Sequence, residues 1–201
     1  MNDFIVENGV LIKYIGKETI GVDVKIPDGV VKIGNGCFRG MQIKCVRFPD
    51  SVTEIGEEAF YNCWNIAKDG PVKVKTIGKS AFEACGFPAF VMNDGVVNIG
   101  ESAFAQCPRI TKLKLPNSVE TIGDGAFKFC ERLEAIDLSK RLIKIPDECF
   151  CGCLALKKIE IPKTVKEIGS RAFAFCASLK NISFEGTEEE WDNIEKADDW
   201  N

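Results

Sequence analysis

The hydrophobic positions of this chain of 201 residues repeat with a period of 22 to 23 residues. An isoleucine followed by glycine recurs in each copy, with Ile145-Pro146 as the variant, and a phenylalanine stands five residues after each isoleucine. A cysteine follows three residues later, except in the first copy, which has Met41. The phenylalanines are Phe38, Phe60, Phe82, Phe104, Phe127, Phe150 and Phe173, and the cysteines are Cys63, Cys85, Cys107, Cys130, Cys153 and Cys176. Seven copies in register indicate a repeat protein.

The copy at residues 156–179 shows which elements one repeat contains. Ile159 and Ile161 alternate with charged residues, which predicts a short strand with one buried face, and Pro162 ends it because proline cannot donate to a strand ladder. The glycine after the later isoleucine, Gly169, suits a turn with positive φ. The apolar spacing around Phe173 predicts a short helical or 3₁₀ segment.

No single copy can bury its own apolar side chains, so the copies must stack. We therefore predict an α/β-type repeat solenoid, with a parallel sheet on one face and short helical or 3₁₀ turns on the other. Residues 23–184 would hold seven repeats and an eighth strand at Ile182 and Phe184. The whole chain would form one structural unit.

The two ends of the stack require caps, because an open stack exposes core side chains and strand edges. We expect a small β cap at residues 1–22. Thr187 and Glu190 read as a capping box, which predicts an acidic capping helix from about 188 to 197 within the tail 185–201. We expect the cap residues Val10, Leu11 and Tyr14 to cover the first repeat, and Trp191 and Ile194 the last.

The repeats resemble those of the BspA-like, or treponemal-type, leucine-rich repeat family. The best copies are PDSVTEIGEEAFYNC at 49–63, PNSVETIGDGAFKFC at 116–130 and PKTVKEIGSRAFAFC at 162–176. The resemblance covers residues 24–184. It implies a right-handed solenoid that binds proteins or surfaces, often on bacterial exteriors, and it implies no catalytic residues and no cofactor.

Composition narrows the function further. The chain has no histidine, which excludes Ser-His-Asp and Cys-His catalysis and histidine metal sites. The net charge of −4, without basic stripes or interleaved aromatics, argues against a nucleic-acid partner. The tail 185–201 carries eight acidic residues and one lysine, which suits a cap and also leaves open a docking tail for a basic partner.

No secretory signal and no apolar run near 18 residues is visible in the sequence, so membrane insertion is not expected. As the chain stands, we expect a cytoplasmic protein whose ten cysteines are free thiols. The alternative is a cell-surface or secreted protein whose signal has been removed.

The segment ECFCGC brings Cys149, Cys151 and Cys153 together and suggests an alternative function as a metal or redox protein. Against this, Cys153 belongs to the repeated cysteines, Cys149 stands where alanine is usual, and no second ligand pair is evident. We therefore read the repeated cysteines as small buried hydrophobic residues. A hydrolase that uses a carboxylate pair is a third hypothesis.

If Ile159 and Ile161 point inward, their neighbours along the strand point to the open face of the sheet. The same parity in every copy places a small apolar centre with a basic rim on that face. A patch of this kind suits protein docking. We therefore predict a non-enzymatic protein-interaction module whose partner is a protein of unknown identity, with weak self-association left open. The predicted partner-binding residues are Arg47, Ala67, Ala89, Val91, Lys112 and Lys114.

Overall fold

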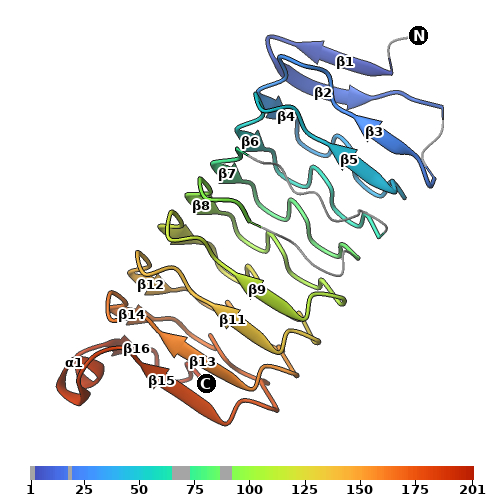
Figure 1. Ribbon diagram of the computed structural model, residues 1–201. Helices are drawn as coiled ribbons and strands as arrows, with labels where there is room; N and C mark the ends of the chain where they lie inside the picture. The colour runs from blue at the N-terminus through green and yellow to red at the C-terminus, as the bar shows by residue number, and fades with distance from the viewer. Residues whose placement is uncertain (1–2, 18–19, 65–72, 87–91) are drawn as a thin grey trace.

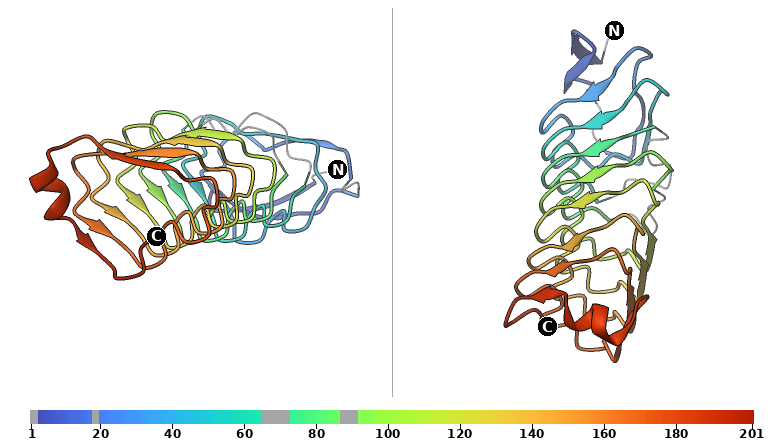
Figure 2. Two further views of the ribbon diagram at one scale, coloured as in Figure 1. Left: turned by 90° about the horizontal axis from the view of Figure 1, so that it is seen from below. Right: turned by 90° about the vertical axis from the view of Figure 1, so that its left-hand side faces the viewer.

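The computed structural model describes residues 3–17, 20–64, 73–86 and 92–201. The chain winds into a stack of coils, one for each repeat, and forms an elongated β-solenoid (Figure 1). Strands lie on two faces of the stack, and turns form the remaining side (Figure 2). The repeat period in the sequence is therefore the length of one coil.

The first of the two faces consists of strands of three or four residues, and we call it the long-strand face. Its strands pair in parallel, β3 with β5, β9 with β11, and β13 with β15. These are the strands predicted from the alternation at Ile159 and Ile161, which both point into the core. The strands are β3 (Asp23–Lys25), β5 (Cys45–Arg47), β9 (Lys112–Lys114), β11 (Ala135–Asp137), β13 (Lys158–Ile161) and β15 (Asn181–Phe184).

A second face of parallel strands corrects the prediction of a sheet on one face only. The isoleucine of each Ile-Gly pair ends a two-residue strand, and most of these isoleucines pair in register with the isoleucine of the next coil, as Ile55 does with Ile77. Besides β2 (Val10–Tyr14), the strands of this second face are β4 (Lys32–Ile33), β6 (Glu54–Ile55), β7 (Thr76–Ile77), β8 (Asn98–Ile99), β10 (Thr121–Ile122), β12 (Lys144–Ile145), β14 (Glu167–Ile168) and β16 (Glu195–Lys196).

The glycines after these isoleucines are needed for close approach between coils, and the predicted turn with positive φ is wrong. Gly100 and Gly169 are not among the glycines with positive φ. A Cβ atom on Gly100 would lie 2.7 Å from the backbone carbon of Gly78. The Gly100 N–H also donates to the carbonyl of Ile77, one coil earlier, at 2.8 Å. Only glycine leaves room for this contact between neighbouring backbones.

Pro146 explains why this second face is divided into two sheets. The first sheet ends at β10 and the next begins at β12. Pro146 stands where the other copies have glycine, and a proline has no N–H to donate to the carbonyl of Ile122. The ladder resumes at Gly169, whose N–H donates to the Ile145 carbonyl at 2.8 Å. The repeat that has Ile145-Pro146 in place of an Ile-Gly pair is thus the point at which the hydrogen-bond ladder is interrupted.

The side of the coil that contains the phenylalanine is built from turns, so the predicted helical or 3₁₀ segments are absent from the described copies. Glu58 and Asn62 have φ angles of 52° and 56°, which interrupt any run of helical residues. Between them, the Phe60 N–H donates to the carbonyl of Ala81 in the next coil at 2.8 Å. Hydrogen bonds to the next coil therefore alternate with turn hydrogen bonds within the segment, such as that from the Tyr61 N–H to the Glu58 carbonyl at 3.0 Å.

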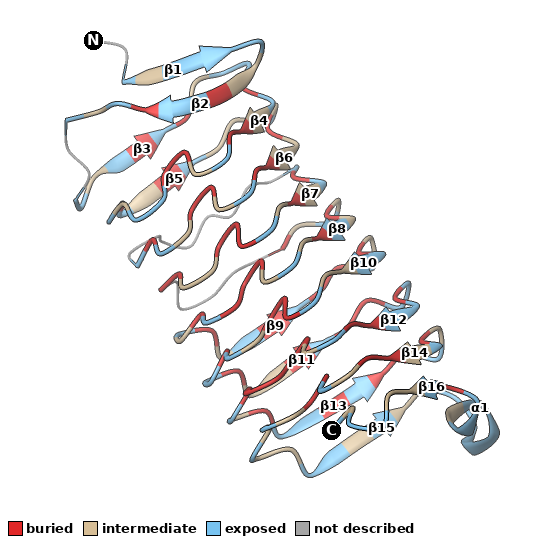
Figure 3. Ribbon diagram, turned by 180° about the vertical axis from the view of Figure 1, so that it is seen from behind, coloured by how far each residue is buried: buried red, intermediate tan, exposed pale blue. Residues whose placement is uncertain are grey.

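A column of phenylalanine rings forms the centre of the core. Neighbouring rings from Phe38 to Phe173 are stacked, with centroids 5.0 to 5.7 Å apart and planes within 14° of each other. The isoleucines of both faces and the repeated cysteines surround this column, and the buried residues follow one another along the whole stack (Figure 3). The stack therefore has one continuous hydrophobic core.

The N-terminal end is closed by the antiparallel pair β1 (Phe4–Glu7) and β2 (Val10–Tyr14). The buried side chain of Leu11 belongs to the core, and the ring of Tyr14 lies 5.6 Å from that of Phe38. The aromatic column thus continues into this hairpin.

At the C-terminal end, helix α1 spans Glu188–Asp192 and has the capping box of Thr187 and Glu190. The helix is shorter than the predicted 188–197, because β16 follows and pairs with β14. Trp191 and Ile194 pack against the core, and Trp200 covers the last phenylalanine, Phe173, with ring centroids 6.0 Å apart. The sequence did not reveal this role of Trp200.

Candidate functional site

Along each strand of the long-strand face, side chains alternate between the core and the outer surface. Val46, Leu113 and Ile136 are buried in the core, whereas the residues on either side of them point outward. The outward positions are Asp23, Lys25, Cys45, Arg47, Lys112, Lys114, Ala135, Asp137, Lys158, Glu160, Asn181 and Ser183. Cys45 and Ala135 are half-buried, and the other ten are exposed. Neighbouring strands hold these side chains in fixed rows.

Three of the six predicted partner-binding residues lie on this face. Arg47 is exposed on β5, and Lys112 and Lys114 are exposed on β9. The other three, Ala67, Ala89 and Val91, lie outside the described residues. The apolar centre of the predicted patch therefore stays a prediction.

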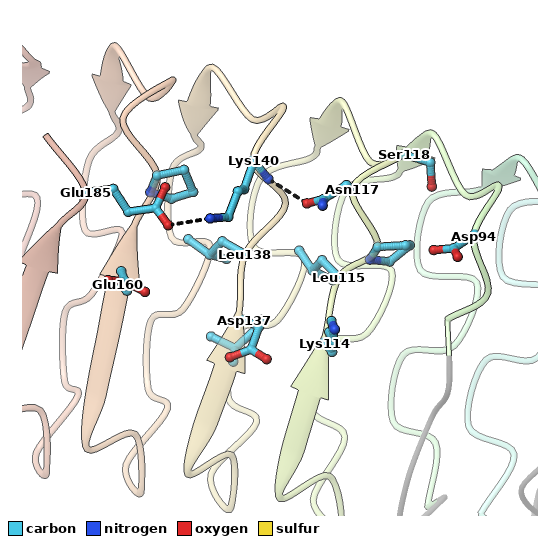
Figure 4. A pocket seen from close by; sticks show the side chains of 13 residues that line it. Asp94, Lys114, Leu115, Asn117, Ser118, Asp137, Leu138, Lys140, Glu160 and Glu185 are labelled. Atoms are coloured by element: carbon cyan, nitrogen blue, oxygen red, sulfur yellow. Dashed lines mark hydrogen bonds and ion pairs between the residues drawn. The ribbon is translucent and has the colours of Figure 1, made fainter.

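A groove of about 640 Å³ lies where β9, β11 and β13 end, beside the predicted patch (Figure 4). Of the three predicted residues that the structure describes, Lys114 lines it and the other two do not. The side chains of Leu115 and Leu138 supply apolar surface to the groove, together with Pro116 and Pro162. The remaining lining residues are Asp94, Asn117, Ser118, Ile136, Asp137, Lys140, Glu160 and Glu185.

A salt bridge and two hydrogen bonds fix the polar rim of the groove. Lys140 Nζ lies 3.0 Å from Glu185 Oε1, and this salt bridge joins two coils that are not neighbours. The hydrogen bond to Glu185 and the negative charge of its carboxylate raise the pKa of Lys140. The backbone N–H of Lys140 donates to Asn117 Oδ1 at 3.1 Å. Ser118 Oγ accepts from the Gly95 N–H at 3.0 Å. The rim is therefore held in place before anything binds.

Other charged side chains of the groove lie in no ion pair within the described residues. Lys114 and Asp137 occupy matched positions on paired strands, and Glu160 holds the equivalent position on β13. No salt bridge within 4.0 Å joins these three to a described residue, although many carboxylates elsewhere pair with a lysine or arginine of a neighbouring coil, as Glu101 does with Lys79. Glu160 does lie near Lys140, since its charge helps to raise the pKa of that lysine.

The repeated cysteines have a structural role. The thiol of Cys63 donates to the carbonyl of Phe38 at 3.0 Å, and that of Cys85 donates to Phe60 in the same way. Burial raises the pKa of Cys63 to about 12 and that of the half-buried Cys176 to about 11. These thiols stay protonated at neutral pH, whereas a nucleophile or metal ligand must be a thiolate.

The segment of Cys149, Cys151 and Cys153 shows no metal site. All three thiols are buried, and burial is the main cause that raises the pKa of each. Cys153 donates to the carbonyl of Phe127 at 3.3 Å, as the other repeated cysteines do in their own coils. Within the described ranges, no group of three or more cysteines and carboxylates is placed to hold a metal ion. Nothing in the described structure supports the metal or redox alternative.

The fold and this surface define a leucine-rich repeat solenoid. The family model for the BspA-type leucine-rich repeat region matches residues 17–85 and 75–194, in six copies. The chain therefore belongs to the BspA-type leucine-rich repeat family, as its repeats indicated. Proteins with such repeats are in general non-catalytic modules that mediate protein interactions. A search among curated proteins finds no match.

Solved structures of bacterial leucine-rich repeat proteins agree with this assignment. A leucine-rich repeat protein from Bacteroides ovatus is 31% identical with a TM-score of 0.77, and the match covers 90% of this chain and 50% of that one. The leucine-rich repeat protein of T. pallidum is 30% identical with a TM-score of 0.77, covering 85% and 82% of the two chains. This chain thus spans half the length of the B. ovatus protein. Among the residues described, no helix has the length and hydrophobicity to cross a bilayer.

Proposed function

We propose that this chain is a non-enzymatic protein-interaction module that holds a partner protein against its long-strand face. The observation that supports the proposal is the alternation of inner and outer side chains along these strands. Their inner side chains belong to the core, so the strands are rigid, while most of their outer side chains are exposed. Changing an outer side chain costs the fold little, so this surface can be specialised for recognition.

The basic residues Arg47, Lys112 and Lys114 would form the rim of the docking surface. Ala67, Ala89 and Val91, which the repeat frame places between them, would form its apolar centre. A small apolar centre with a charged rim is the usual organisation of a protein interface. The positive charges would attract acidic groups of the partner and fix its orientation.

The double variant Lys112→Glu/Lys114→Glu tests this proposal in affinity capture from native extract. We expect the partner that wild type captures to be lost, while the Tm changes by about 2 °C or less because both side chains are exposed. The matched control is Lys13→Glu/Lys17→Glu, which makes the same change of charge at exposed positions outside the long-strand face. The variant Val91→Asp tests the apolar centre in the same way.

Two outcomes would contradict the proposal. Either both double variants retain the same captured proteins as wild type, or capture falls only in proportion to the fraction of protein that has unfolded. In either case the long-strand face is a solvated surface without a binding role.

A further inference from the structure

The groove at the ends of β9, β11 and β13 runs along the axis of the stack. Its lining residues come from successive coils, from Asp94 at one end to Glu185 at the other (Figure 4). Neighbouring parallel strands lie about 4.8 Å apart, so four steps between these coils make the groove about 19 Å long. An extended chain advances about 3.3 Å per residue, so a groove of this length holds about six residues.

Charges of both signs line the groove along that axis, with Asp94 at one end, Lys114 next to it, and Asp137 and Glu160 beyond Lys114. Lys114 on β9 is positive, whereas Asp137 on β11 and Glu160 on β13 are negative (Figure 4). All three side chains are exposed, and the described residues offer none of them a salt bridge. Leu115 and Leu138 line the groove beside them, and their exposed fractions are 2% and 8%. A ligand that complements this surface needs side chains of both charges, arranged in a fixed order.

The spacing of the strands sets the spacing of those charges. From β9 to β13 there are two strand intervals, or about 10 Å. A polyproline II chain repeats its face every third residue and rises about 3.1 Å per residue, so side chains three residues apart lie about 9.3 Å apart on one side. Its backbone makes no internal hydrogen bonds and is free to lie on the exposed ends of the strands.

We propose that the groove binds an extended segment of the partner with an acidic side chain over Lys114 and, three residues away, a basic side chain over Glu160. This inference rests on the proposed function, because it names the chemistry of the docked segment. The salt bridge of Lys140 with Glu185 runs along the rim of the groove, parallel to the proposed segment (Figure 4).

The test uses fluorescein-labelled octapeptides and fluorescence polarisation with the full chain. The first probe is Pro-Val-Glu-Val-Pro-Lys-Val-Pro, in which the two charges stand three residues apart. The second probe has glutamate in place of the lysine, and the third moves both charges to a spacing of five residues. We expect saturable binding of the first probe and binding of the other two that is weaker by about threefold to tenfold.

Variants at Glu160 then test the site itself. Glu160→Gln is expected to weaken binding of the first probe by about 1.5-fold to fivefold, since one exposed charge contact is lost. Glu160→Lys is expected to reverse the preference, so that the probe with two glutamates binds more tightly than the first probe. Asp23→Asn is the control, because it removes a carboxylate from the same face outside the groove. The Tm of each variant is measured to show that it is folded.

Absence of saturable binding of the first probe, or equal binding by wild type and Glu160→Gln, would overturn the inference. Equal affinity for all three probes would also overturn it, since the charge order would then play no part. These failures are distinct from failure of the proposed function. Capture of a partner that depends on Lys112 and Lys114 would still place a partner on the long-strand face, although its docked segment would have a different chemistry.

Discussion

Two kinds of glycine occur in the stack, and they serve different purposes. Gly100 has an ordinary φ angle but no space for a Cβ atom, because the backbone of Gly78 and Lys79 lies against it. Gly36 has a φ angle of 60°, and apart from its two neighbours in the chain, no described residue has a heavy atom within 4 Å of the position that its Cβ would occupy. The first glycine is required by the neighbouring coil, whereas the second is required only by its own backbone angle.

This difference predicts that the two glycines tolerate substitution to different degrees. Gly100→Ala should destabilise the protein by about 1–3 kcal/mol, because two backbone segments must move apart. Gly36→Ser should cost less, because Ser80 and Ser102 already adopt φ near 50° at the equivalent position of later coils. Urea denaturation measures both changes. A Gly100→Ala protein as stable as wild type would show that the coils can separate at this point without loss.

At the scale of the coil, the stacked phenylalanine ring is the largest single contribution to the core. Phe127 lies 5.7 Å from Phe104 and 5.6 Å from Phe150, and it has no exposed surface. Phe127→Ala should lower the free energy of unfolding by about 3–5 kcal/mol, since it leaves a cavity between two rings. Phe129→Ala removes a ring of the same size that is partly exposed, and it should cost less. Equal losses in the two variants would contradict a core built on the column.

The sequence predicted the elements whose signal extends over several residues. The alternation at Ile159 and Ile161 spans a whole strand, and the phenylalanine column repeats in every coil, so both were evident. The strands of the second face, such as Thr76–Ile77, have two residues and cannot show an alternation. Their stability comes from pairing with equally short strands one coil away, which no local pattern records.

The same reasoning explains what the sequence could predict of the candidate site. Parity along the strand placed Lys112 and Lys114 on the outer face, where they are exposed. Lys140 and Glu185 stand after the strands, where parity no longer applies, and their salt bridge joins residues two coils apart. The rim of the groove is therefore a product of coil stacking, and it became visible only with the coils in place.

At the scale of the whole molecule, the repeated cysteines should make the folded protein less stable as the pH rises into the alkaline range. Burial raises the pKa of Cys63 to about 12, and it also raises the pKa of Cys85 and Cys107. Below the pKa of the unfolded thiol, near 8.5, both states are protonated and the full stability is present. As the pH rises above that value, the unfolded chain loses protons that the folded chain retains, so stability falls until the pH passes the folded pKa.

Each buried thiol adds up to about 1.4 kcal/mol of lost stability per pH unit in this window. Urea denaturation at pH 7.5, 9 and 10 should therefore show a steep fall for wild type and a shallower fall for Cys63→Ala. Ile55→Val is the control, because it weakens the same core but removes no thiol. It should lose stability at every pH and keep the wild-type slope. If wild type and Cys63→Ala fall in parallel, the thiols do not govern the alkaline limit, and lysine and tyrosine titration must account for it.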